Sequence, residues 1–249
     1  MEIRKSLCVS LFCGAIAFCS AAPSLAQMPP PPPVQLSGMQ QTQYAPTVYT
    51  AGRMKLFLQA GYGVGFDSID VGTTTSGDRV SISGGGGGAL DLGIGYGLSP
   101  MLDLDVEIGG EVSTLTPAVA NADGTFTRSY LLATVKRKLP TSDTGQFKVG
   151  VGLGAYMNGE LDVDARNAGG FHDIIKYKNA LGVHLTGEFE RFVAPSTSFH
   201  VGMKMYFVTY KADSATSNGV PYSADALPGD VKDLNGSGLD FLVGVSQYF

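Results

Sequence analysis

Apolar and polar residues alternate along much of this chain between Met54 and the C-terminal Phe249. In 147–157, for example, Val149, Val151 and other apolar residues fall at every second position, with mostly lysine and glycine between them. A repeat of two is that of a β-strand, whose successive side chains point to opposite faces, whereas a helix repeats every ~3.6 residues. The alternation therefore predicts an all-β protein.

The alternating stretches predict eight strands, each about a dozen residues long. A tilted strand that crosses a membrane needs ~9–11 residues, whereas strands in soluble folds usually have ~5–6. The predicted strands are 54–66, 88–98, 102–112, 128–139, 146–157, 179–191, 197–209 and 238–249.

The connections between these strands alternate between long and short. The long ones are 67–87, 113–127, 158–178 and 210–237, and the short ones are 99–101, 140–145 and 192–196. Long outer loops and short inner turns are typical of an up-and-down membrane barrel. We therefore expect an eight-stranded antiparallel up-and-down transmembrane β-barrel over 54–249.

The polar faces of the strands indicate which side of this barrel faces lipid. A membrane barrel turns its apolar residues to lipid and its polar residues to the lumen, and a soluble lipocalin-like barrel does the reverse. Glycines on the polar face leave room in a narrow lumen for long charged side chains. The charged residues on that face are Asp91, Asp103, Asp105, Glu107, Glu111, Lys136, Lys148, Glu188 and Lys204.

The first 26 residues are typical of a secretory signal peptide. Arg4 and Lys5 precede an apolar run, and Ser24-Leu25-Ala26 provides the small residues that a signal peptidase reads. An N-terminal membrane anchor is the alternative, but the run is short for a ~20-residue span. We place cleavage after Ala26, which predicts export through the Sec pathway.

All three cysteines, Cys8, Cys13 and Cys19, lie in this leader, so the mature chain can form no disulfide. Its mildly negative charge and lack of a basic patch argue against nucleic-acid binding. No later apolar run reaches the length of a membrane helix, which leaves strands as the means of crossing a membrane.

Residues 27–53 are rich in proline, glutamine and threonine, with five consecutive prolines at 29–33. This composition favours extended polyproline II and does not pack a core. We expect a periplasmic lead-in; a peptide-ligand role is the alternative.

Three segments resemble a known superfamily, the bacterial outer-membrane barrels of the opacity-protein and outer-membrane-protein-A type. These are Gly93–Pro100 with Leu102–Glu107, then Phe147–Tyr156, and the final Asp240–Phe249. The resemblance implies outer-membrane lipid around the barrel and recognition of its last strand by the barrel assembly machinery, although Gln247 departs from the usual pattern. It also leads us to expect no peptidoglycan-binding domain after that strand. The residues that would form the assembly signal are Phe241, Val243, Val245 and Phe249.

The charges of the lumen are the main candidate site. A symmetric connection between 102–112 and 128–139 puts Asp105 near Lys136 and Asp103 near Lys138, and the turn at 192–196 brings Glu188 towards His200. These charges form either a structural plug or an ion-selective path, and the narrow interior of eight strands favours the plug. The predicted network comprises Asp91, Asp103, Asp105, Glu107, Lys136, Lys138, Glu188, His200 and Lys204.

Catalytic and metal sites find little support in the sequence. His172 falls in a predicted loop, His184 and His200 face the lumen, and no nucleophile accompanies them. The acidic residues of 210–237 do not have the spacing of an EF-hand. We therefore predict neither enzyme activity nor a cofactor.

Superfamily members of this kind include anchors, adhesins, surface antigens, narrow pores and a few enzymes, so the fold does not specify the activity. We expect a structural anchor, antigen or adhesin that meets a host or environmental ligand through its four long loops. A narrow porin-like channel for ions or small solutes is the alternative.

Overall fold

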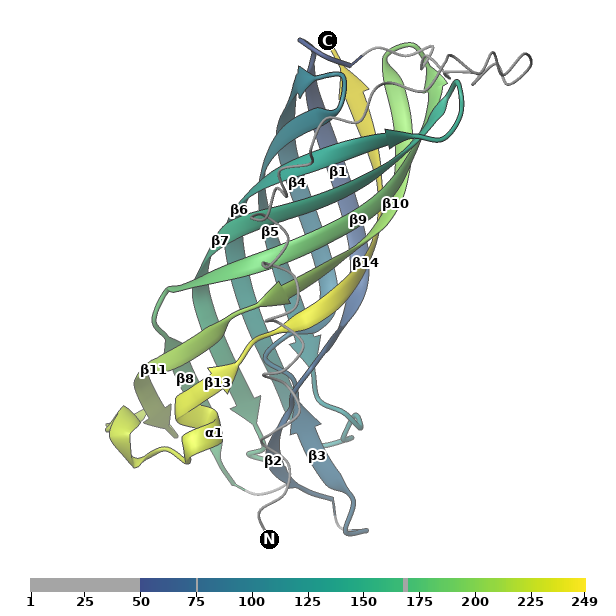
Figure 1. Cartoon of the computed structure of the whole chain (residues 1–249). Coiled ribbons are helices and arrows are strands. Elements are labelled where there is room, and N and C mark those ends of the chain that lie inside the picture. The colour runs from purple at the N-terminus through teal and green to yellow at the C-terminus, as the bar shows by residue number, and fades with distance from the viewer. Residues whose placement is uncertain (1–49, 75, 168–169) are drawn as a thin grey trace, which may run out of the picture. The chain divides into compact units, whose positions relative to one another are not determined.

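The computed structural model describes residues 50–74, 76–167 and 170–249. The predicted signal peptide and residues 27–49 of the proline-rich segment lie outside these ranges. Eight long strands form the main body of the described part (Figure 1). They are β1 (Met54–Gly65), β4 (Gly86–Ser99), β5 (Leu102–Thr114), β6 (Asp123–Pro140), β7 (Gly145–Asp164), β9 (Ala180–Ala194), β10 (Thr197–Phe207) and β14 (Gly238–Tyr248).

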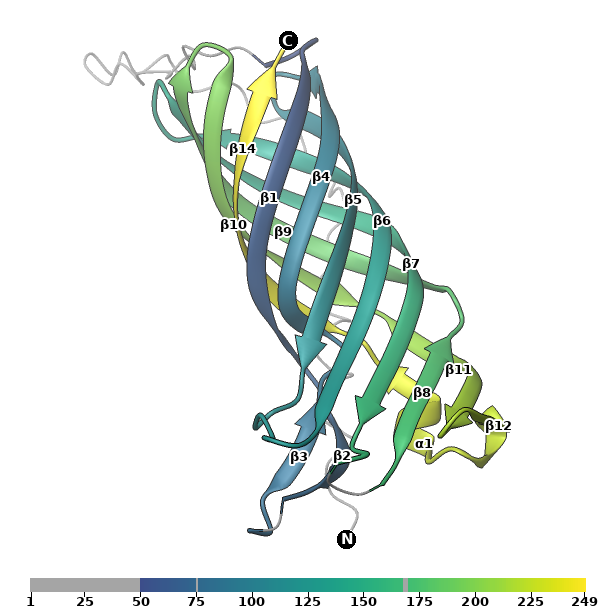
Figure 2. The ribbon, with the colours of Figure 1, turned by 180° about the vertical axis from the view of Figure 1, so that it is seen from behind.

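These eight strands close into a barrel in which each pairs antiparallel with its neighbours along the chain (Figure 2). The final pairing joins β14 to β1 from Lys55↔Tyr248 to Gly65↔Gly238. Closure gives every long strand a partner on both sides, so the barrel has no open edge. The predicted eight-stranded up-and-down fold is confirmed.

The side chains alternate between the two faces of the barrel wall as the sequence predicts. Leu90, Leu153 and Val243 are 59%, 69% and 62% exposed on the outer face, while Asp91 and Lys148 are fully buried on the inner face. The apolar residues therefore surround the barrel and the charges fill it. No helix among the described residues is long and apolar enough to cross a membrane.

The four long connections were predicted as loops, but they contain ordered structure. They contribute β2 (Ile69–Thr73), β3 (Arg79–Ile82), β8 (His172–Tyr177), β11 (Thr209–Ser217), β12 (Val220–Tyr222), β13 (Asp233–Asn235), a 3₁₀ turn at Ala224–Ala226 and the short helix α1 (Gly229–Lys232). In Figure 1 they lie at one end of the barrel, which we call the loop end. The C-terminus and the short connections lie at the other, which we call the turn end.

One correction concerns the end of β7. Asn158-Gly159 is a typical turn sequence, and the predicted strand accordingly stopped at 157. In the structure β7 continues to Asp164, because Asn158 adopts a left-handed conformation (φ 53°) beside a register shift at Thr127/Ser129. The pair forms a bulge within a longer ladder, where an irregular residue bends a strand without ending it.

The glycine run at 84–88, most of which falls in the predicted connection 67–87, is also largely part of the barrel. Gly86 pairs with Val64 and Gly88 with Val112. Gly86 and Gly87 have φ values of 79° and 105°. A Cβ on Gly86 would lie 2.6–2.7 Å from the backbone of Val64. The run therefore provides a conformation and a close approach that other residues rarely tolerate.

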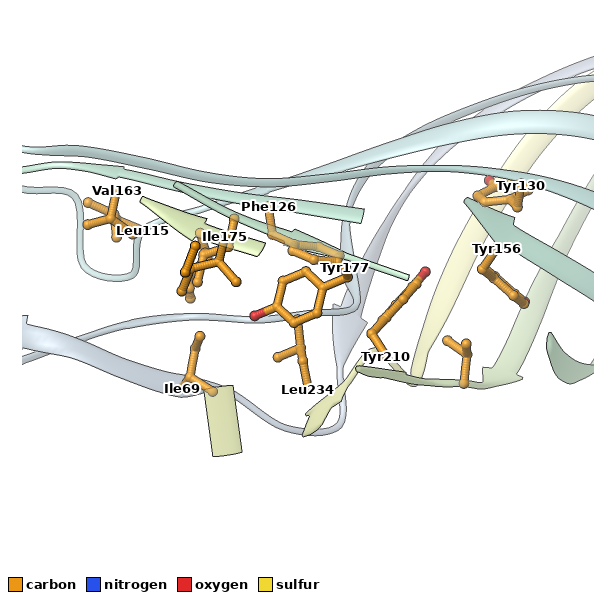
Figure 3. Packing of buried hydrophobic residues seen from close by; sticks show 14 of the residues in the cluster. Ile69, Leu115, Phe126, Tyr130, Tyr156, Val163, Ile175, Tyr177, Tyr210 and Leu234 are labelled. Carbon is orange, nitrogen blue, oxygen red and sulfur yellow. The ribbon is translucent and has the colours of Figure 1, made fainter. Parts of the chain in front are cut away.

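Apolar side chains pack between the ordered connections into what we call the loop-end core (Figure 3). At its centre, the ring centroids of Phe126, Tyr177 and Tyr210 lie 5.8–6.0 Å apart at steep angles, the edge-to-face arrangement that aromatic rings prefer. The core gives the loop end its own packing. Its residues are Ile69, Val80, Ile82, Leu115, Phe126, Leu161, Val163, Ile175, Tyr177, Tyr210, Ala215 and Leu234.

Candidate functional site: the charged lumen

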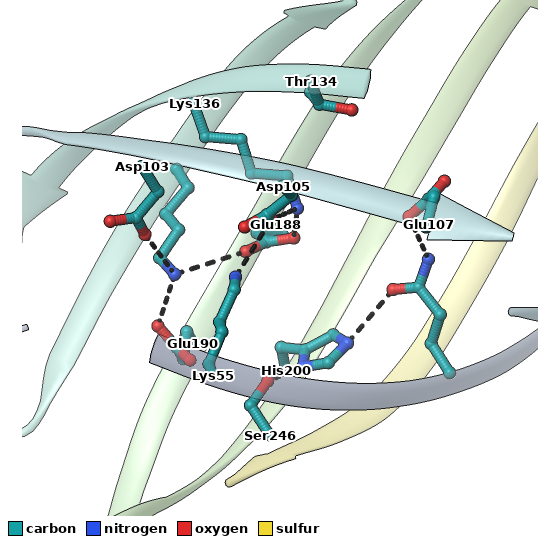
Figure 4. Close-up of polar contacts among 12 residues, drawn as sticks. Lys55, Asp103, Asp105, Glu107, Thr134, Lys136, Glu188, Glu190, His200 and Ser246 are labelled. Carbon is teal, nitrogen blue, oxygen red and sulfur yellow. Dashed lines mark hydrogen bonds and ion pairs between the residues drawn. The ribbon is translucent and has the colours of Figure 1, made fainter. Parts of the chain in front are cut away.

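Charged side chains from opposite sides of the barrel meet along its interior (Figure 4). Strand β5 presents four carboxylates at alternate or near-alternate positions, and β6 presents three cations from the adjacent strand. Each of these side chains is buried. The β5 residues are Asp103, Asp105, Glu107 and Glu111, and the β6 residues are Arg128, Lys136 and Lys138.

At the turn end, Lys148 is the centre of the network. Its Nζ lies 3.0 Å from Asp103, 2.7 Å from Glu190 and 3.6 Å from Glu188. Lys138 approaches the other oxygen of Asp103 at 2.6 Å. Two lysines thus share one aspartate, and each member of the group has at least one oppositely charged partner.

The described end of the proline-rich segment joins this group. Lys138 donates a hydrogen bond of 2.8 Å to the hydroxyl of Thr50, which is buried. The backbone amide of Gly52 bonds to the carbonyl of Gly97 at 2.7 Å. Residues 50–53 are therefore attached to the turn end of the barrel.

In the middle of the lumen, Asp105 lies between two lysines. Lys55 and Lys136 each approach its Oδ2 at 2.9 Å, and Lys136 also binds Glu188 at 2.6 Å. Farther towards the loop end, Lys204 pairs with Asp91 at 2.9 Å and with Glu107.

Arg128 closes the network at the loop end. Its guanidinium bonds to Glu111 at 2.5 Å and to the carbonyl of Gly236 at 2.6 Å. It also lies over the rings of Tyr206 and Tyr156, 4.4 Å and 5.3 Å from their centroids. A planar cation with a fork of donors suits this combination of carboxylate, carbonyl and aromatic partners.

The predicted contacts Asp105–Lys136 and Asp103–Lys138 are both present, but the predicted register is two residues off. Asp103 lies opposite Lys136, and Asp105 lies opposite Thr134. Each lysine reaches its aspartate diagonally, which a long side chain allows. The symmetric-connection assumption was wrong, and the length of the lysine side chains compensates for it.

The predicted contact between Glu188 and His200 is not formed. Both side chains border one small cavity, but no hydrogen bond joins them in the described structure. His200 contacts Gln59 at 3.1 Å and Ser246 at 3.4 Å, whereas Glu188 binds lysines. His200 lies opposite Glu190 on β9, two residues from the predicted partner.

Six buried charged residues of the lumen were not in the predicted network, although two of them, Glu111 and Lys148, were among the charges predicted to face the lumen. The six are Lys55, Glu111, Arg128, Lys148, Glu190 and Asp240. Lys55 precedes the outward Leu56 and Glu190 follows the outward Phe189, so strand alternation alone assigns both to the lumen. Glu111, Arg128, Lys148 and Asp240 follow the same rule.

Very little space remains between these side chains. The cavity bordered by Gln59, Glu107, Lys136, Glu188 and Lys204 has a volume of about 10 Å³. One water molecule needs roughly 10–15 Å³ by the same kind of measure. This cavity therefore has room for about one water molecule.

Three of the predicted assembly-signal residues, Phe241, Val243 and Val245, lie on the outer face of β14, and Phe249 directly follows that strand. Phe241 and Val243 are more than half exposed, as is the terminal Phe249, and Val245 is more covered. Gln247, which departs from the family pattern, accepts a hydrogen bond of 2.9 Å from Thr197.

The polarity of the wall is the reverse of that of a soluble protein. Its outer face carries a continuous apolar surface, and its inner face carries paired charges. Hydrocarbon accepts such a surface only where the backbone is fully paired, as it is in a closed barrel. The fold is that of an outer-membrane β-barrel.

Comparisons with known proteins give matches among solved structures alone. No protein-family model matches the sequence, and no curated protein matches it significantly. Similar solved structures include Neisserial surface protein A, with 14% identity and a TM-score of 0.48, covering 80% of this chain and 98% of that one. The outer membrane protein OprG from Pseudomonas aeruginosa has 14% identity and a TM-score of 0.46, covering 82% and 99%. A major outer membrane protein from Thermus thermophilus has 14% identity and a TM-score of 0.49, covering 79% and 99%.

Several of the remaining polar candidates of the outer-membrane barrel are engaged in pairs. His172, at the loop end, contacts Asp162 at 2.9 Å, and His184 contacts Thr134 at 2.8 Å. Asp225 binds Lys232 at 2.6 Å. Within the described ranges, no group of three or more His, Cys, Asp or Glu side chains is placed to hold a metal ion.

Proposed function

We propose that this chain is a closed surface barrel of the outer membrane, whose lumen is a structural plug and whose loop end makes the contacts outside the cell. The observation that carries the proposal is the packed lumen, where a cavity of about 10 Å³ remains between paired charges. A conducting path needs room for ions and the water around them.

The charge pairing adds an energetic reason for closure. Moving Lys136 aside would leave Asp105 and Glu188 each with one fewer cation, and moving Lys148 would affect Asp103 and Glu190. Removing one partner of a buried ion pair typically costs ~3–5 kcal/mol. Transient opening by movement of one side chain is therefore unfavourable.

The ordered loop end supports a role as antigen, adhesin or structural anchor. Strands and a packed core hold the connections in one arrangement, so they present a fixed surface. Binding to a preformed surface avoids the entropy of ordering a loop. We propose that this surface acts without catalysis and meets a host or environmental ligand.

Two segments of the sequence support a proposal for delivery to the outer membrane. We propose that residues 1–26 direct export and that the outer face of β14 is read by the barrel assembly machinery. Substitutions of Phe249 and Phe241 test the recognition of β14. The substituted proteins should accumulate outside the outer-membrane fraction. Normal membrane levels of both variants would reject it.

Solute flux into vesicles tests the plug. Purified protein is reconstituted into liposomes, and the entry of potassium and of a small sugar is followed after an osmotic step. The unmodified barrel should match empty liposomes, with a known porin as the positive control. Flux above that of empty liposomes would reject the plug and support the narrow channel.

A further inference from the structure

The loop end contains a second cavity, which is separate from the lumen. Its volume is about 210 Å³, and side chains from β2, β7, β8 and the segment around α1 surround it. Figure 3 shows three of them, Ile69, Val163 and Ile175. We call it the loop-end pocket. Its apolar lining is Ile69, Val71, Leu161, Val163, Phe171, Ile175, Leu227, Pro228 and Val231, and its polar lining is Asp70, Asp173 and Tyr222.

One carboxylate in this pocket is in an unusual position. Asp173 lies on the same face of β8 as Ile175 and Tyr177, which are buried in the loop-end core, and its backbone pairs with that of the buried Val163. Strand alternation therefore turns a charged side chain to the apolar side of β8.

The Asp173 side chain is partly buried, and one of its two oxygens lacks the partner that buried acceptors normally have. Its Oδ1 is enclosed and accepts no hydrogen bond from any described residue. Neighbouring carboxylates differ, because Asp70 pairs with Arg79 at 3.3 Å and Asp162 with His172 at 2.9 Å. A charged acceptor in apolar surroundings is costly unless a donor satisfies it.

The Asp173 carboxylate also affects the hydroxyl of Tyr222. The pKa of this hydroxyl is raised, first by burial and then by the negative charge of Asp173. Tyr222 and Asp173 both line the pocket.

We propose that the loop-end pocket binds a small aliphatic ammonium compound, with its chain in the apolar cavity and its N–H groups donating to Asp173 Oδ1. The volume is below the ~300–1,000 Å³ of pockets for drug-sized molecules, so the ligand is a short-chain amine. A carboxylate ligand would be repelled by Asp173, and a neutral alcohol would provide one uncharged donor. The proposal does not depend on whether the lumen is closed.

Binding of three probes of equal chain length tests this assignment. Hexylamine, 1-hexanol and hexanoate are titrated into the full-length mature barrel in lipid nanodiscs at neutral pH, and methyl signals of Ile69, Val163 and Ile175 are followed by NMR. Hexylamine should give saturable shifts, hexanol should bind about tenfold more weakly, and hexanoate should give none, because a charged hydrogen bond contributes more than a neutral one. Equal affinity for all three probes, or shifts confined to lipid-facing residues, would overturn the proposal.

Two variants separate the charge from the cavity. Asp173→Asn should weaken hexylamine about tenfold and weaken hexanol by less, because hexanol loses only the charge of its acceptor whereas hexylamine loses an ion pair. Val163→Phe should reduce both by filling the space. Asp162→Asn is the matched control, because it removes a nearby carboxylate that already has a partner, and hexylamine binding should be unchanged. Full hexylamine affinity in Asp173→Asn would contradict the assignment even if the cavity is occupied.

Discussion

Arg128 and Glu111 form a 2.5 Å ion pair in which the side chains are only 1% and 2% exposed, and this pair closes the lumen at its loop end. The guanidinium also holds the Gly236 carbonyl at 2.6 Å, which connects the wall of the barrel to the segment before β14. The plug thus also has a structural role, because Arg128 connects the ordered loop end to the barrel wall.

Replacement of Arg128 by alanine should be strongly destabilising. It leaves Glu111 buried without its cation, and the free energy of unfolding should fall by ~3–5 kcal/mol. Urea titration of the barrel in lipid vesicles measures this change. Arg79→Ala is the control, because its exposed pair with Asp70 should contribute ~0–1 kcal/mol. Equal effects of the two substitutions would contradict the buried pair.

Arginine on the outer face should be costly wherever the wall meets lipid. Val151→Arg and Val243→Arg should each lower the stability by ~2–4 kcal/mol near the bilayer midplane. Val220, exposed on β12 at the loop end, is the matched control and should tolerate arginine. The shift between folded and unfolded bands in unboiled gel samples provides the measurement. Insertion of Val151→Arg and Val243→Arg at the level of the unmodified protein would show that these positions do not face lipid.

Addition of a methyl group on the inner face should destabilise the barrel by steric crowding rather than by placing a charge in lipid. A Cβ on Gly152 would lie 2.5 Å from the ring of His184, so Gly152→Ala should destabilise the barrel by crowding. Urea titrations at low and high salt measure the change in stability, which should not depend on salt. A strong salt dependence would point to a change in the charge network.

Asp105 and Lys136 should show strong coupling in a double-mutant cycle. Loss of either alone leaves a buried charge short of a partner, at ~3–5 kcal/mol, whereas loss of both leaves Lys55 and Glu188 as one cation and one anion. Unfolding free energies of the two alanine variants and their double variant give the coupling. Additive effects would reject the pair.

Disruption of the loop-end core should leave the barrel folded. Phe126→Ala removes a ring that contacts Tyr177 and Tyr210, with an expected loss of ~3–5 kcal/mol from that core. Limited proteolysis should then cut the loop end while the barrel keeps its resistance. Unchanged proteolysis would show that the core does not order this end.

The alternation of residues is sufficient to predict the barrel, because lipid outside and a charged lumen inside impose the same period on all strands. It also assigns Lys55 and Glu190 to the lumen. The register between β5 and β6 could not be predicted, since it depends on the conformation of the connection, which includes bridges between Ser81 and Thr116 and between Val119 and Ala122.

The ordered loop end was not predictable for a related reason. Asn158-Gly159 has the sequence of a turn, and only the packing of Leu161 and Val163 in the loop-end core shows why the strand continues. Such packing joins residues far apart in the sequence, so local propensity cannot reveal it. Asp173 could not be identified as a candidate ligand-binding residue for the same reason, because the cavity that it lines is formed by segments far apart in the sequence.

Single-channel recording in planar bilayers tests the central claim, a closed lumen, most directly. Insertion of the barrel is first verified by protease treatment, from which the bilayer should protect the membrane-spanning strands. With the network from Lys148 to Arg128 intact, the membrane current should remain at the level of the empty bilayer across the applied voltages. Reproducible conductance steps from the unmodified barrel would contradict the plug.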